Sequence, residues 1–412
     1  MHTEITDAAR NVGTTTAAPA KVAIVYRIVP HYRVAFYKGL SAFLAQRGVE
    51  LTLFGGQPLP EEAFEDCGGH IDCHVFAPNR YVHKQIYYQP LFDRLKDFDL
   101  VVIEQANSAL LNYPLFLRRM LGVGPRLAFW GHGDDLQQQA PARLRRAMKR
   151  FLSCRVDHWF AYTDSVKSIV RGMGFPDSRI TVVQNAIDVS TTLALAEDLT
   201  PAGRAAIRER LGLPDAPTAV FCARLTEGKG LPFLIAACER ARARIPNLHL
   251  LVVGEGPLGP WLDRQAKDKP WIRPLGARYG REKAEILSTA EVFLLPSFVG
   301  LSILDAFAAG LPVLTADFRN HSPEVDYLQD RVNGLFVMGQ PDPNTYGAAI
   351  SGVLTDDALR GQLREGAFQT ARHRTVDAMV SNFGSGILQA LDAAGRLSHR
   401  AEEPAGSTWS VP

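Results

Sequence analysis

The chain has 412 residues, of which 46% are hydrophobic and 21% charged, and its formal net charge at pH 7 is only +2. This length predicts two domains, because a single hydrophobic core stops growing at roughly 250–300 residues. The nearly balanced charge provides no general signal for nucleic-acid binding, and no run reaches the ~20 apolar residues that a membrane-spanning helix needs.

The five cysteines form an odd set without a C-x-x-C pair. This pattern argues against a disulfide framework or a zinc site and fits a reducing compartment, so we expect a cytoplasmic protein. Residues 1–20 lack the apolar segment of a signal peptide and carry Glu4 and Asp7. We therefore expect a disordered lead there.

Residues 21–187 alternate between apolar, strand-like runs and helical segments. This alternation predicts a parallel sheet with helices on both faces. Ligands of such sheets bind outside the carboxyl ends of the strands, so the residues that follow each strand are the candidates. The expected strands are 22–27, 51–54, 100–104, 127–130 and 158–162, and the expected helices include 34–46, 113–121, 141–152 and 165–172.

Polar side chains follow several of these strands. His31 and Arg33 lie beyond the first strand, Glu104 ends the third, and His132 stands between two glycines after the fourth. Flanking glycines let a backbone approach a ligand closely. Each of the four is a candidate for substrate contact, with a structural role as the alternative.

Residues 143–150 carry five cations within an expected helix, and Leu144, Met148, Phe151 and Leu152 add apolar contacts. A basic amphipathic helix can lie on an anionic membrane. The alternative is a solvated helix face over a core, so both readings stay open here.

The second half repeats the alternation of strands and helices. Residues 188–204 have little apolar periodicity and contain Pro201, so we expect a domain linker there, followed by a helix over 205–211. The second domain spans 205–375, with alternating elements from Thr218 to about Val337. Helices dominate from there to about Leu397, and residues 398–412 are expected to form a disordered tail.

The most informative segment lies in this second domain. Residues 218–221 predict a buried strand and residues 231–237 a helix, and the loop between them carries Arg224 and Lys229. A helix N-terminus offers free N–H groups and a positive dipole end, so this loop suits phosphate. The alternative is two solvated cations on a surface loop.

Four further segments accompany this loop. They are Val-Gln-Asn-Ala-Ile-Asp at 183–188, a strand entering a Gly-x-Gly-Pro turn at 254–257, a strand ending at Pro296-Ser297, and residues 300–314 with Asp305. In this order and spacing, the set closely resembles glycosyltransferase family 4, the retaining GT-B enzymes that use nucleotide-sugar donors. The resemblance is strong over about residues 180–340 and looser over residues 21–180.

The resemblance implies an α/β protein with the GT-B fold, in which two Rossmann-like doubly wound domains face a central cleft. Residues 21–187 would form the acceptor-side domain, residues 205–375 the domain that binds the nucleotide sugar, and residues 376–397 a helix that returns to the N-terminal domain. The implied activity is retaining transfer of a sugar from a nucleotide-diphosphate sugar to a glycan or lipid-linked acceptor. Such products belong to cell-surface polysaccharide or glycolipid synthesis, at the inner membrane face if the acceptor is a lipid.

By the same resemblance, Arg224 and Lys229 contact the donor diphosphate, whose negative charge grows as the glycosidic bond breaks. Asp305 takes the place of the acid that binds the ribose hydroxyls, and His132 lies against the donor sugar. Ser297 stands where the family usually has a glutamate, so that charge near the sugar is missing here.

The other implied contacts complete this assignment. On the acceptor side, His31 and Arg33 can meet an anionic acceptor, and Glu104 can bind acceptor hydroxyls. Glu324 is either the acid of a family loop or a helix cap. The remaining donor contacts are Gly254, Gly256, Ala277, Arg278, Gly300, Leu301 and Ser302.

Two side-chain cations and helix N-termini can neutralise a diphosphate, so neither a metal nor a cofactor is expected. An inverting enzyme needs a general base on the acceptor side. By the resemblance His132 faces the donor sugar instead, so we expect the anomeric configuration to be retained.

Two other functions remain open. Residues 254–259 match the G-x-G-x-x-G fingerprint of NAD-dependent oxidoreductases, although the next strand region ends without the ribose-binding acid. Ser297 is the support for a non-catalytic GT-B protein that binds a sugar or a partner enzyme. No nucleic-acid partner is expected.

Overall fold

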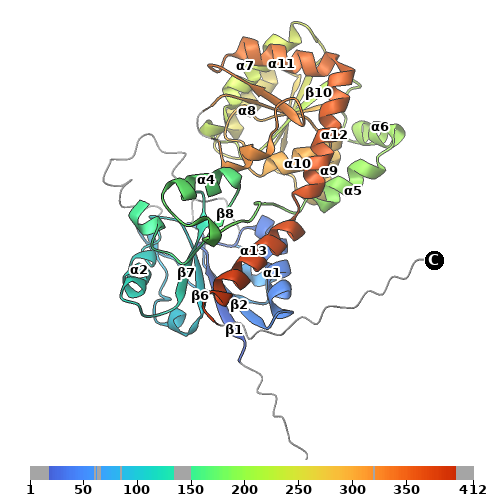
Figure 1. Ribbon diagram of the computed structural model, residues 1–412. Coiled ribbons are helices and arrows are strands. Elements are labelled where there is room, and N and C mark those ends of the chain that lie inside the picture. Colours follow the sequence, from blue (N-terminus) through green and yellow to red (C-terminus); the bar gives the residue numbers. More distant parts are fainter. Residues whose placement is uncertain are drawn as a thin grey trace, which may run out of the picture.

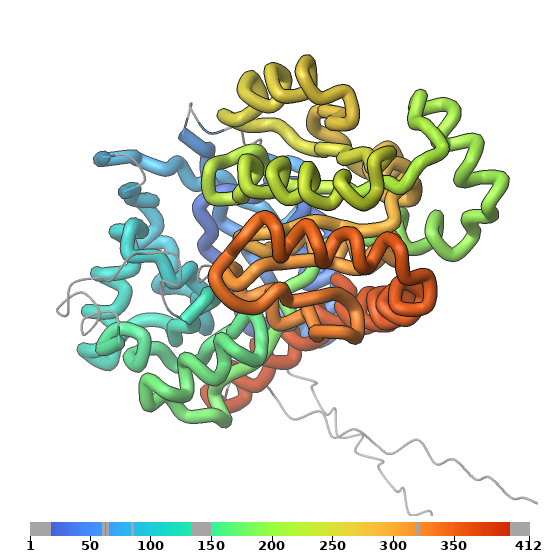
Figure 2. Tube along the Cα trace, turned by 90° about the horizontal axis from the view of Figure 1, so that it is seen from above, coloured from blue at the N-terminus to red at the C-terminus, as the bar shows by residue number. Residues whose placement is uncertain are grey.

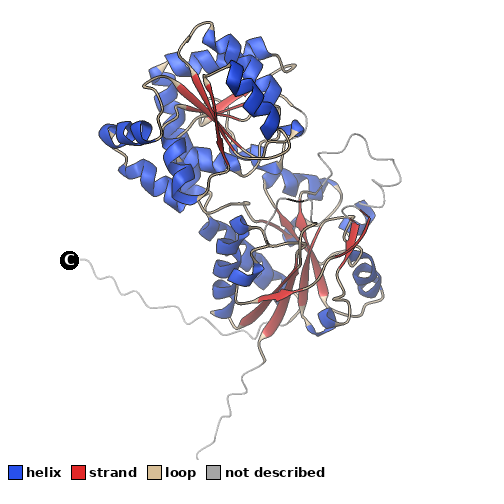
Figure 3. Cartoon of the chain, turned by 180° about the vertical axis from the view of Figure 1, so that it is seen from behind, coloured by secondary structure: helices blue, strands red, loops and turns tan. Residues whose placement is uncertain are grey.

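The computed structural model describes residues 18–59, 62, 66–83, 86–133, 150–318 and 321–395. They form two lobes, each a parallel sheet with helices on both of its faces (Figures 1 and 3). Strands and helices alternate along the chain in both lobes, which confirms the doubly wound α/β class.

The N-terminal lobe contains a seven-stranded parallel sheet in the spatial order β3-β2-β1-β6-β7-β8-β9. Its strands are near-continuous apolar runs, as expected for a sheet covered on both faces. The strand order reverses between β1 and β6, which pair directly. The strands are β1 Ala20–Val25, β2 Val49–Gly55, β3 His74–Phe76, β6 Leu100–Glu104, β7 Arg126–Gly131, β8 His158–Ala161 and β9 Ile180–Val182.

The C-terminal lobe contains a six-stranded parallel sheet in the spatial order β12-β11-β10-β13-β14-β15. Its order reverses between β10 and β13, and such a switch point is where doubly wound sheets bind ligands. The strands are β10 Thr218–Cys222, β11 His249–Val253, β12 Ile272–Gly276, β13 Val292–Leu294, β14 Val313–Ala316 and β15 Gly334–Val337. A separate hairpin in the N-terminal lobe pairs β4 Arg80–His83 with β5 Ile86–Tyr88.

The helices cover both faces of the two sheets. In the described N-terminal lobe they are α1 Val34–Ala45, α2 Asn112–Met120 and α4 Asp164–Gly172. In the rest of the chain they are α5 Ser190–Asp198, α6 Pro201–Arg210, α7 Leu231–Arg242, α8 Gly259–Asp268, α9 Gly280–Ser288, α10 Ser302–Ala308, α11 Pro343–Thr355, α12 Asp357–His373 and α13 Val376–Asp392. α11 lies beside α7, where Gly347 leaves room for the backbone of α7 (Figure 2).

The last helix, α13, leaves the C-terminal lobe and packs along α1 of the N-terminal lobe (Figure 1). Two glycines permit this close approach, because a Cβ on Gly384 would lie 2.4 Å from the Phe43 ring and one on Gly39 would lie 3.0 Å from Val380. Phe383 stacks on Phe160 of β8 at a centroid distance of 4.1 Å. The C-terminal helix therefore joins the core of the N-terminal lobe.

The segment expected as a linker, residues 188–204, is mostly helical, since it contains α5 and the start of α6. Thr200 accepts a hydrogen bond from the Gly203 N–H at 3.1 Å, and Pro201 occupies the first turn. Threonine at the N-cap followed by proline is a known helix start. The expected helix over 205–211 therefore begins earlier, at Pro201.

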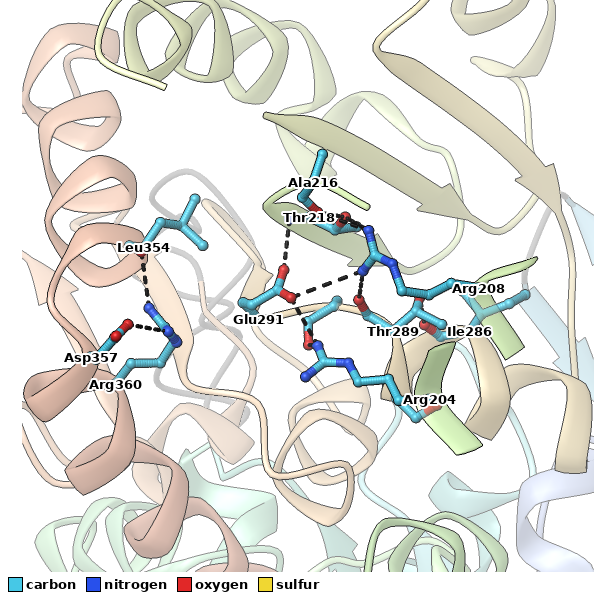
Figure 4. Close-up of polar contacts among 12 residues, drawn as sticks. Arg204, Arg208, Ala216, Thr218, Ile286, Thr289, Glu291, Leu354, Asp357 and Arg360 are labelled. Atoms are coloured by element: carbon cyan, nitrogen blue, oxygen red, sulfur yellow. Dashed lines mark hydrogen bonds and ion pairs between the residues drawn. The ribbon is translucent and has the colours of Figure 1, made fainter. Parts of the chain in front are cut away.

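A polar network fixes α6 to the C-terminal sheet (Figure 4). Arg204 donates to Glu291 Oε1 at 2.9 Å, and the other Glu291 oxygen accepts from the Thr218 N–H at 2.6 Å. Arg208 donates to the Thr289 carbonyl at 2.6 Å. This network lies at the start of β10 and β13, at the edge of the sheet opposite to the carboxyl ends of the strands, which are called the strand exits below.

Within the described residues, no helix combines the length and the apolar character that crossing a bilayer requires. Most of the expected basic helix, residues 141–149, lies outside the described residues, so its membrane role stays a prediction. Residues 1–17 and 396–412 lie outside them as well, so they contain most of the lead expected at residues 1–20 and all of the tail expected at residues 398–412. Ala20, the last residue of the expected lead, belongs to β1.

Candidate active site

The strand exits of the two lobes meet at their boundary. His31, beyond β1, lies against Tyr279, directly before α9, with ring centroids 5.2 Å apart. At the start of α4, the Ser165 N–H donates to Asp326 of the C-terminal lobe at 2.9 Å. The candidate residues that follow the strands of both lobes therefore face a common region.

The loop after β10 brings two cations to the switch point of the C-terminal sheet. Arg224 is exposed and Lys229 is half-buried. Gly230 has φ of 69°, a left-handed conformation that favours glycine, and it turns the chain directly into α7. Lys229 thus lies just before a 12-residue helix and Arg224 earlier in the same loop, between a strand and a helix as the sequence predicted.

Lys229 also touches the loop after β13. Its ammonium donates to the Phe298 carbonyl at 2.6 Å, and the neighbouring Gly228 and Gly230 leave room for Phe298 and Ser297. Burial lowers the pKa of Lys229, and the charge of Glu324 opposes this shift. The ammonium is therefore a cation that would gain from a further negative charge nearby.

The loop after β13 has a fixed and unusual backbone. Phe298 has φ of 47°, which is uncommon for a bulky residue. His321 supports this loop: its Nδ1 accepts from the Val299 N–H at 3.2 Å, and its Nε2 lies 3.0 Å from the Ala316 carbonyl. These partners require the proton on Nε2. Ser297, which replaces the usual glutamate, is 3% exposed.

Asp305 lies on α10 and is 5% exposed. Its Oδ1 forms an ion pair with Lys283 of α9 at 2.6 Å. Burial raises the pKa of Asp305, and Lys283 opposes this rise. The acid assigned to the donor ribose is therefore paired with a lysine that the sequence analysis did not identify.

The glycines of the 254–259 fingerprint have a structural role. A Cβ on Gly254 would lie 2.0 Å from the Ala223 carbonyl oxygen, and one on Gly256 would lie 2.6 Å from that of Leu225. The Leu225 N–H donates to the Glu255 carbonyl at 2.9 Å, so the exits of β10 and β11 pair along their backbones. These two glycines thus allow the loop that carries Arg224 to pack closely against the backbone of the loop after β11.

The loop after β12 is the candidate for contact with the nucleotide base. Gly276 has φ of 69°, and the exposed Arg278 donates to the Ala277 carbonyl at 2.8 Å and approaches Glu282 at 3.7 Å. At the start of α10, Gly300, Leu301 and Ser302 are half-buried.

The N-terminal lobe contributes a carboxylate, Glu62, that is influenced by Arg224 of the C-terminal lobe. The Arg27 guanidinium forms an ion pair with Glu62 at 2.7 Å. The backbone N–H of Arg27 donates to Glu104 Oε2 at 3.1 Å. Burial opposes ionisation of Glu62, but the hydrogen bond from Arg27 lowers its pKa, with a smaller contribution from Arg224. Glu62 thus pairs with the residue that follows β1 and lies within electrostatic reach of Arg224 in the other lobe.

Arg33 does not lie on the acceptor-facing surface. Its side chain is 2% exposed, it donates to Asn185 Oδ1 at 2.6 Å, and its guanidinium lies 5.0 Å from the centre of the Trp130 ring. Because a guanidinium in this position is enclosed by protein, we do not retain the expected contact with an anionic acceptor for Arg33.

Asn185 joins the two lobes. Its Nδ2 donates to Glu324 at 2.5 Å, and its carbonyl accepts from Tyr327 at 2.9 Å. Burial raises the pKa of Glu324, and the Asn185 hydrogen bond and the charges of Arg33 and Lys229 oppose the rise. Glu324 is therefore an interdomain contact, and it also lies in the first turn of the 3-10 helix Pro323–Tyr327, so its two roles inferred from the sequence stay predictions.

His132 lies at the exit of β7, as expected. Its ring lies 4.5 Å from that of Tyr162. Gln105 holds the turn by donating to the Gly133 carbonyl at 2.9 Å and to the Ser153 hydroxyl at 3.1 Å. Among the described residues, no group of three or more His, Cys, Asp and Glu side chains is arranged to hold a metal ion.

Sequence reasoning missed three members of this region: Lys283, Glu62 and the role of Asn185. Lys283 and Glu62 stand outside the five segments, and no local pattern distinguishes them from solvated charges. Asn185 does lie within the 183–188 segment, but only the packed lobes show which groups its amide contacts.

Comparison with known proteins matches each lobe to a family model of glycosyltransferases. Residues 36–191 match the family model described as Glycosyltransferase Family 4, and residues 216–356 match the one described as Glycosyl transferases group 1. The D-inositol 3-phosphate glycosyltransferase of Stackebrandtia nassauensis is 30% identical over 237 residues, which are 52% of this chain and 50% of that protein. A GDP-mannose-dependent alpha-(1-6)-phosphatidylinositol monomannoside mannosyltransferase of Mycolicibacterium smegmatis is 30% identical over 210 residues, 47% of this chain and 54% of that protein. The chain thus spans about half the length of these relatives.

Solved structures match over nearly the whole chain. HepE of Anabaena, solved in complex with UDP, has a TM-score of 0.66 at 16% identity and covers 90% of this chain and 99% of its own. Sucrose-phosphate synthase of Thermosynechococcus elongatus has a TM-score of 0.67 at 18% identity, with 91% and 100% covered. At these identities the likeness concerns the fold. The two family matches and the two doubly wound lobes together show that the chain belongs to the family 4 and group 1 glycosyltransferases of the GT-B fold.

Proposed function

We propose that this protein transfers a sugar from a nucleoside-diphosphate sugar to a hydroxyl group of a glycan or lipid-linked acceptor. The observation that carries the proposal is the pair of cations beside the N-terminus of α7, at the switch point of the C-terminal sheet. Burial lowers the pKa of the Lys229 ammonium, and a diphosphate beside it would favour the charged form. Arg224 is exposed at the same loop.

The donor would extend along the carboxyl edge of the C-terminal sheet. Its diphosphate would contact Arg224 and Lys229, and its ribose hydroxyls would bind Asp305, which follows the neighbouring strand β13. Its base would meet the loop with Ala277 and Arg278. The sugar would then point toward His132 of the other lobe.

The acceptor would bind on the side of the N-terminal lobe. We assign its contacts to His31 and Glu104, which lie at the exits of the paired strands β1 and β6. Burial raises the pKa of Glu104, and its carboxyl group would hydrogen-bond an acceptor hydroxyl. Relatives named for inositol phosphate and for a phosphatidylinositol mannoside favour a phosphorylated polyol or a lipid-linked glycan as the acceptor class.

A lipid-linked acceptor would bring the protein to the inner face of a membrane. The five cations of residues 143–150 would then add attraction to anionic lipids, about 1 kcal/mol for each charge near the surface. Liposome binding at low salt tests this, and no retention on phosphatidylserine vesicles would remove the membrane from the proposal.

We infer that the reaction retains the anomeric configuration. The acceptor oxygen would attack the anomeric carbon on the face from which the phosphate departs, and the departing phosphate oxygen would take the acceptor proton. Arg224 and Lys229 would stabilise the charge that develops on this phosphate. Because His132 would act mainly as charge develops on the sugar, His132→Ala should lower kcat more than donor affinity.

The same two cations and the helix N-terminus would neutralise the diphosphate without a divalent ion. Activity measured with excess EDTA should equal activity measured with magnesium. A requirement for magnesium or manganese would refute this part of the proposal.

The central experiment is a thermal-shift panel of UDP-, GDP- and ADP-linked sugars, because a ligand that binds the native state raises the melting temperature. One of these donors should raise it, and NAD should not. The stabilising donor is then incubated with glycan and glycolipid acceptors, and NMR of the anomeric proton determines the product. A β-linked product from an α-linked donor would overturn retention, and a shift with NAD alone would restore the oxidoreductase alternative.

A further inference from the structure

The pair of Lys283 and Asp305 is a buried ion pair in the donor half of the protein. Asp305 Oδ1 and Lys283 Nζ are 2.6 Å apart, and the two side chains are 6% and 19% exposed. In the described part of the chain, Lys283 is the ion-pair partner of this Oδ1 atom, and no donor meets the geometry of a hydrogen bond to it. A buried carboxylate oxygen in this state can still accept a hydrogen bond.

Few charged groups surround the Asp305 carboxylate. In the described chain they are Lys283 on α9, Cys222 at the end of β10 and His31 from the loop beyond β1. Burial and, to a smaller extent, the negative charge of Asp305 raise the pKa of the Cys222 thiol to about 12, so this thiol is neutral near pH 7. His31 is exposed, and its effect on Asp305 is smaller than that of Lys283. Lys283 is thus the main group that compensates the carboxylate.

We propose that Lys283 is a positioning residue that keeps Asp305 ionised and aimed to accept hydrogen bonds from the vicinal ribose hydroxyls of the donor nucleotide. The inference rests on the proposed function, because it concerns the same nucleotide. Aspartate is one methylene shorter than the glutamate that the resemblance leads one to expect, so its carboxylate stays closer to the α10 backbone that carries it. An ionised carboxylate accepts at both oxygens, whereas a protonated one carries a proton that faces the hydroxyls or the lysine.

Removal of the ammonium has a defined consequence. Without Lys283, burial of the carboxylate is compensated only by the weaker His31 charge, so the pKa of Asp305 rises further. Asp305 then loses its proton at a higher pH than in the unmodified protein, and it regains its charge only as the pH is raised. Loss of affinity from this cause is reversed at high pH, whereas loss from a distorted helix is not.

The test is calorimetric titration of UDP, GDP and ADP into the full chain between pH 6 and pH 9.5. The variants are Lys283→Met, Lys283→Arg and Asp305→Asn, and Lys267→Met on the exposed face of α8 is the matched control. At pH 7, Lys283→Met should bind the preferred nucleotide at least about 10-fold more weakly, the size of one lost hydrogen bond to a charged group. Its deficit should shrink toward pH 9.5, whereas that of Asp305→Asn should persist at every pH.

Two further comparisons separate positioning from general support of the fold. Lys283→Arg should restore affinity, because it returns the charge. The 2′,3′-dideoxy form of the same nucleoside diphosphate should bind the unmodified protein and Lys283→Met equally, because the hydroxyls are absent. Where Lys283→Met does not fold, Lys283→Gln takes its place in the same titrations.

The outcomes distinguish a failure of the proposed function from a failure of the role assigned to Lys283. If no nucleoside diphosphate binds the unmodified protein, the proposed function fails. If one binds but the Lys283→Met deficit is independent of pH, or is equal for the dideoxy nucleotide, the function stands and the role of Lys283 is overturned. An unchanged affinity of Lys283→Met overturns it as well.

Discussion

Arg208 and Lys229 are both cations of the C-terminal lobe that are withdrawn from water, yet their surroundings differ. Arg208 lies at the edge of the sheet where the strands begin, called the amino edge here. Its guanidinium donates to the carbonyls of Thr289 and Ala216 and to the Thr218 hydroxyl (Figure 4). Lys229 lies at the carboxyl edge. It donates to a carbonyl of the loop after β13, and burial lowers its pKa.

The difference separates charges that serve the fold from charges that would serve a ligand. The two terminal nitrogens of Arg208 donate to protein oxygens, so this cation contributes to stability, and its removal would leave buried acceptors without partners. A cation whose charged form is penalised by burial gains from an added anion. Substitutions at the amino edge should therefore change stability, and substitutions at the carboxyl edge should change nucleotide binding.

The largest effect is expected for the partner of the arginines at the amino edge. Glu291→Ala removes the acceptor of Arg204 and of the Thr218 N–H and the charge that faces Arg208, and each buried donor left without a partner costs about 1–3 kcal/mol. Urea denaturation should show this loss of unfolding free energy, with nucleotide affinity unchanged in the folded fraction. The exposed pair of Glu197 and Arg372 is the matched control, where Glu197→Ala should cost less than about 1 kcal/mol. Equal losses in both variants would erase the contrast.

A buried histidine in the N-terminal sheet extends the comparison to pH. Burial lowers the pKa of His158 from 6.5 to about 4. Above pH 6.5 the folded and unfolded forms are both neutral. Between pH 6.5 and pH 4 the unfolded chain binds a proton that the folded chain refuses, so stability falls with decreasing pH, by about 3 kcal/mol in total.

The measurement is urea denaturation of the unmodified protein and of His158→Gln from pH 4 to pH 8. Glutamine can keep a hydrogen bond to Thr181, which lies 2.8 Å from His158 Nε2. The variant should show a shallower fall in stability below pH 6.5, although other groups still titrate. Identical pH profiles would mean that His158 accepts its proton inside the fold.

At the carboxyl edge, Lys229→Ala should reduce kcat/KM about 10-fold to 150-fold, because one charge-assisted contact to a phosphate is worth about 1.5–3 kcal/mol. The melting temperature should change little, since the variant no longer buries an ammonium but leaves the Phe298 carbonyl without its donor. Steady-state kinetics with the preferred donor and a thermal melt measure the two effects. Lys267→Ala on α8 is the control, and wild-type kinetics for Lys229→Ala would remove the lysine from the site.

The smallest effect is expected for Glu324→Gln. Burial raises the pKa of this carboxyl group, so its ionised form costs stability once the pH exceeds its pKa in the unfolded chain, near 4.5. Glutamine keeps an acceptor for the Asn185 amide and carries no charge. The variant should therefore melt at a higher temperature than the unmodified protein at pH 8 and at nearly the same temperature at pH 4.5. A destabilised variant at pH 8 would show that Arg33 and Lys229 need the charge.

Much of the scaffold was predictable from local patterns. The expected strands at 22–27, 100–104 and 127–130 correspond to β1, β6 and β7, and the expected helix over 34–46 corresponds to α1. Apolar runs and helical spacing are local, so a short window of sequence contains them. The short strands β3 and β9 were missed, because three residues do not establish a period.

The sequence by itself determined the doubly wound class, the family resemblance and the loop with Arg224 and Lys229, because each depends on neighbouring residues and their order. Only the tertiary structure decided the partners of the buried charges. In the folded protein Arg33 is buried and donates to Asn185, and Lys283 lies beside Asp305. The physical reason is that burial and pairing of a charge depend on elements distant in the chain, and a pKa or an ion pair arises only when those elements pack together.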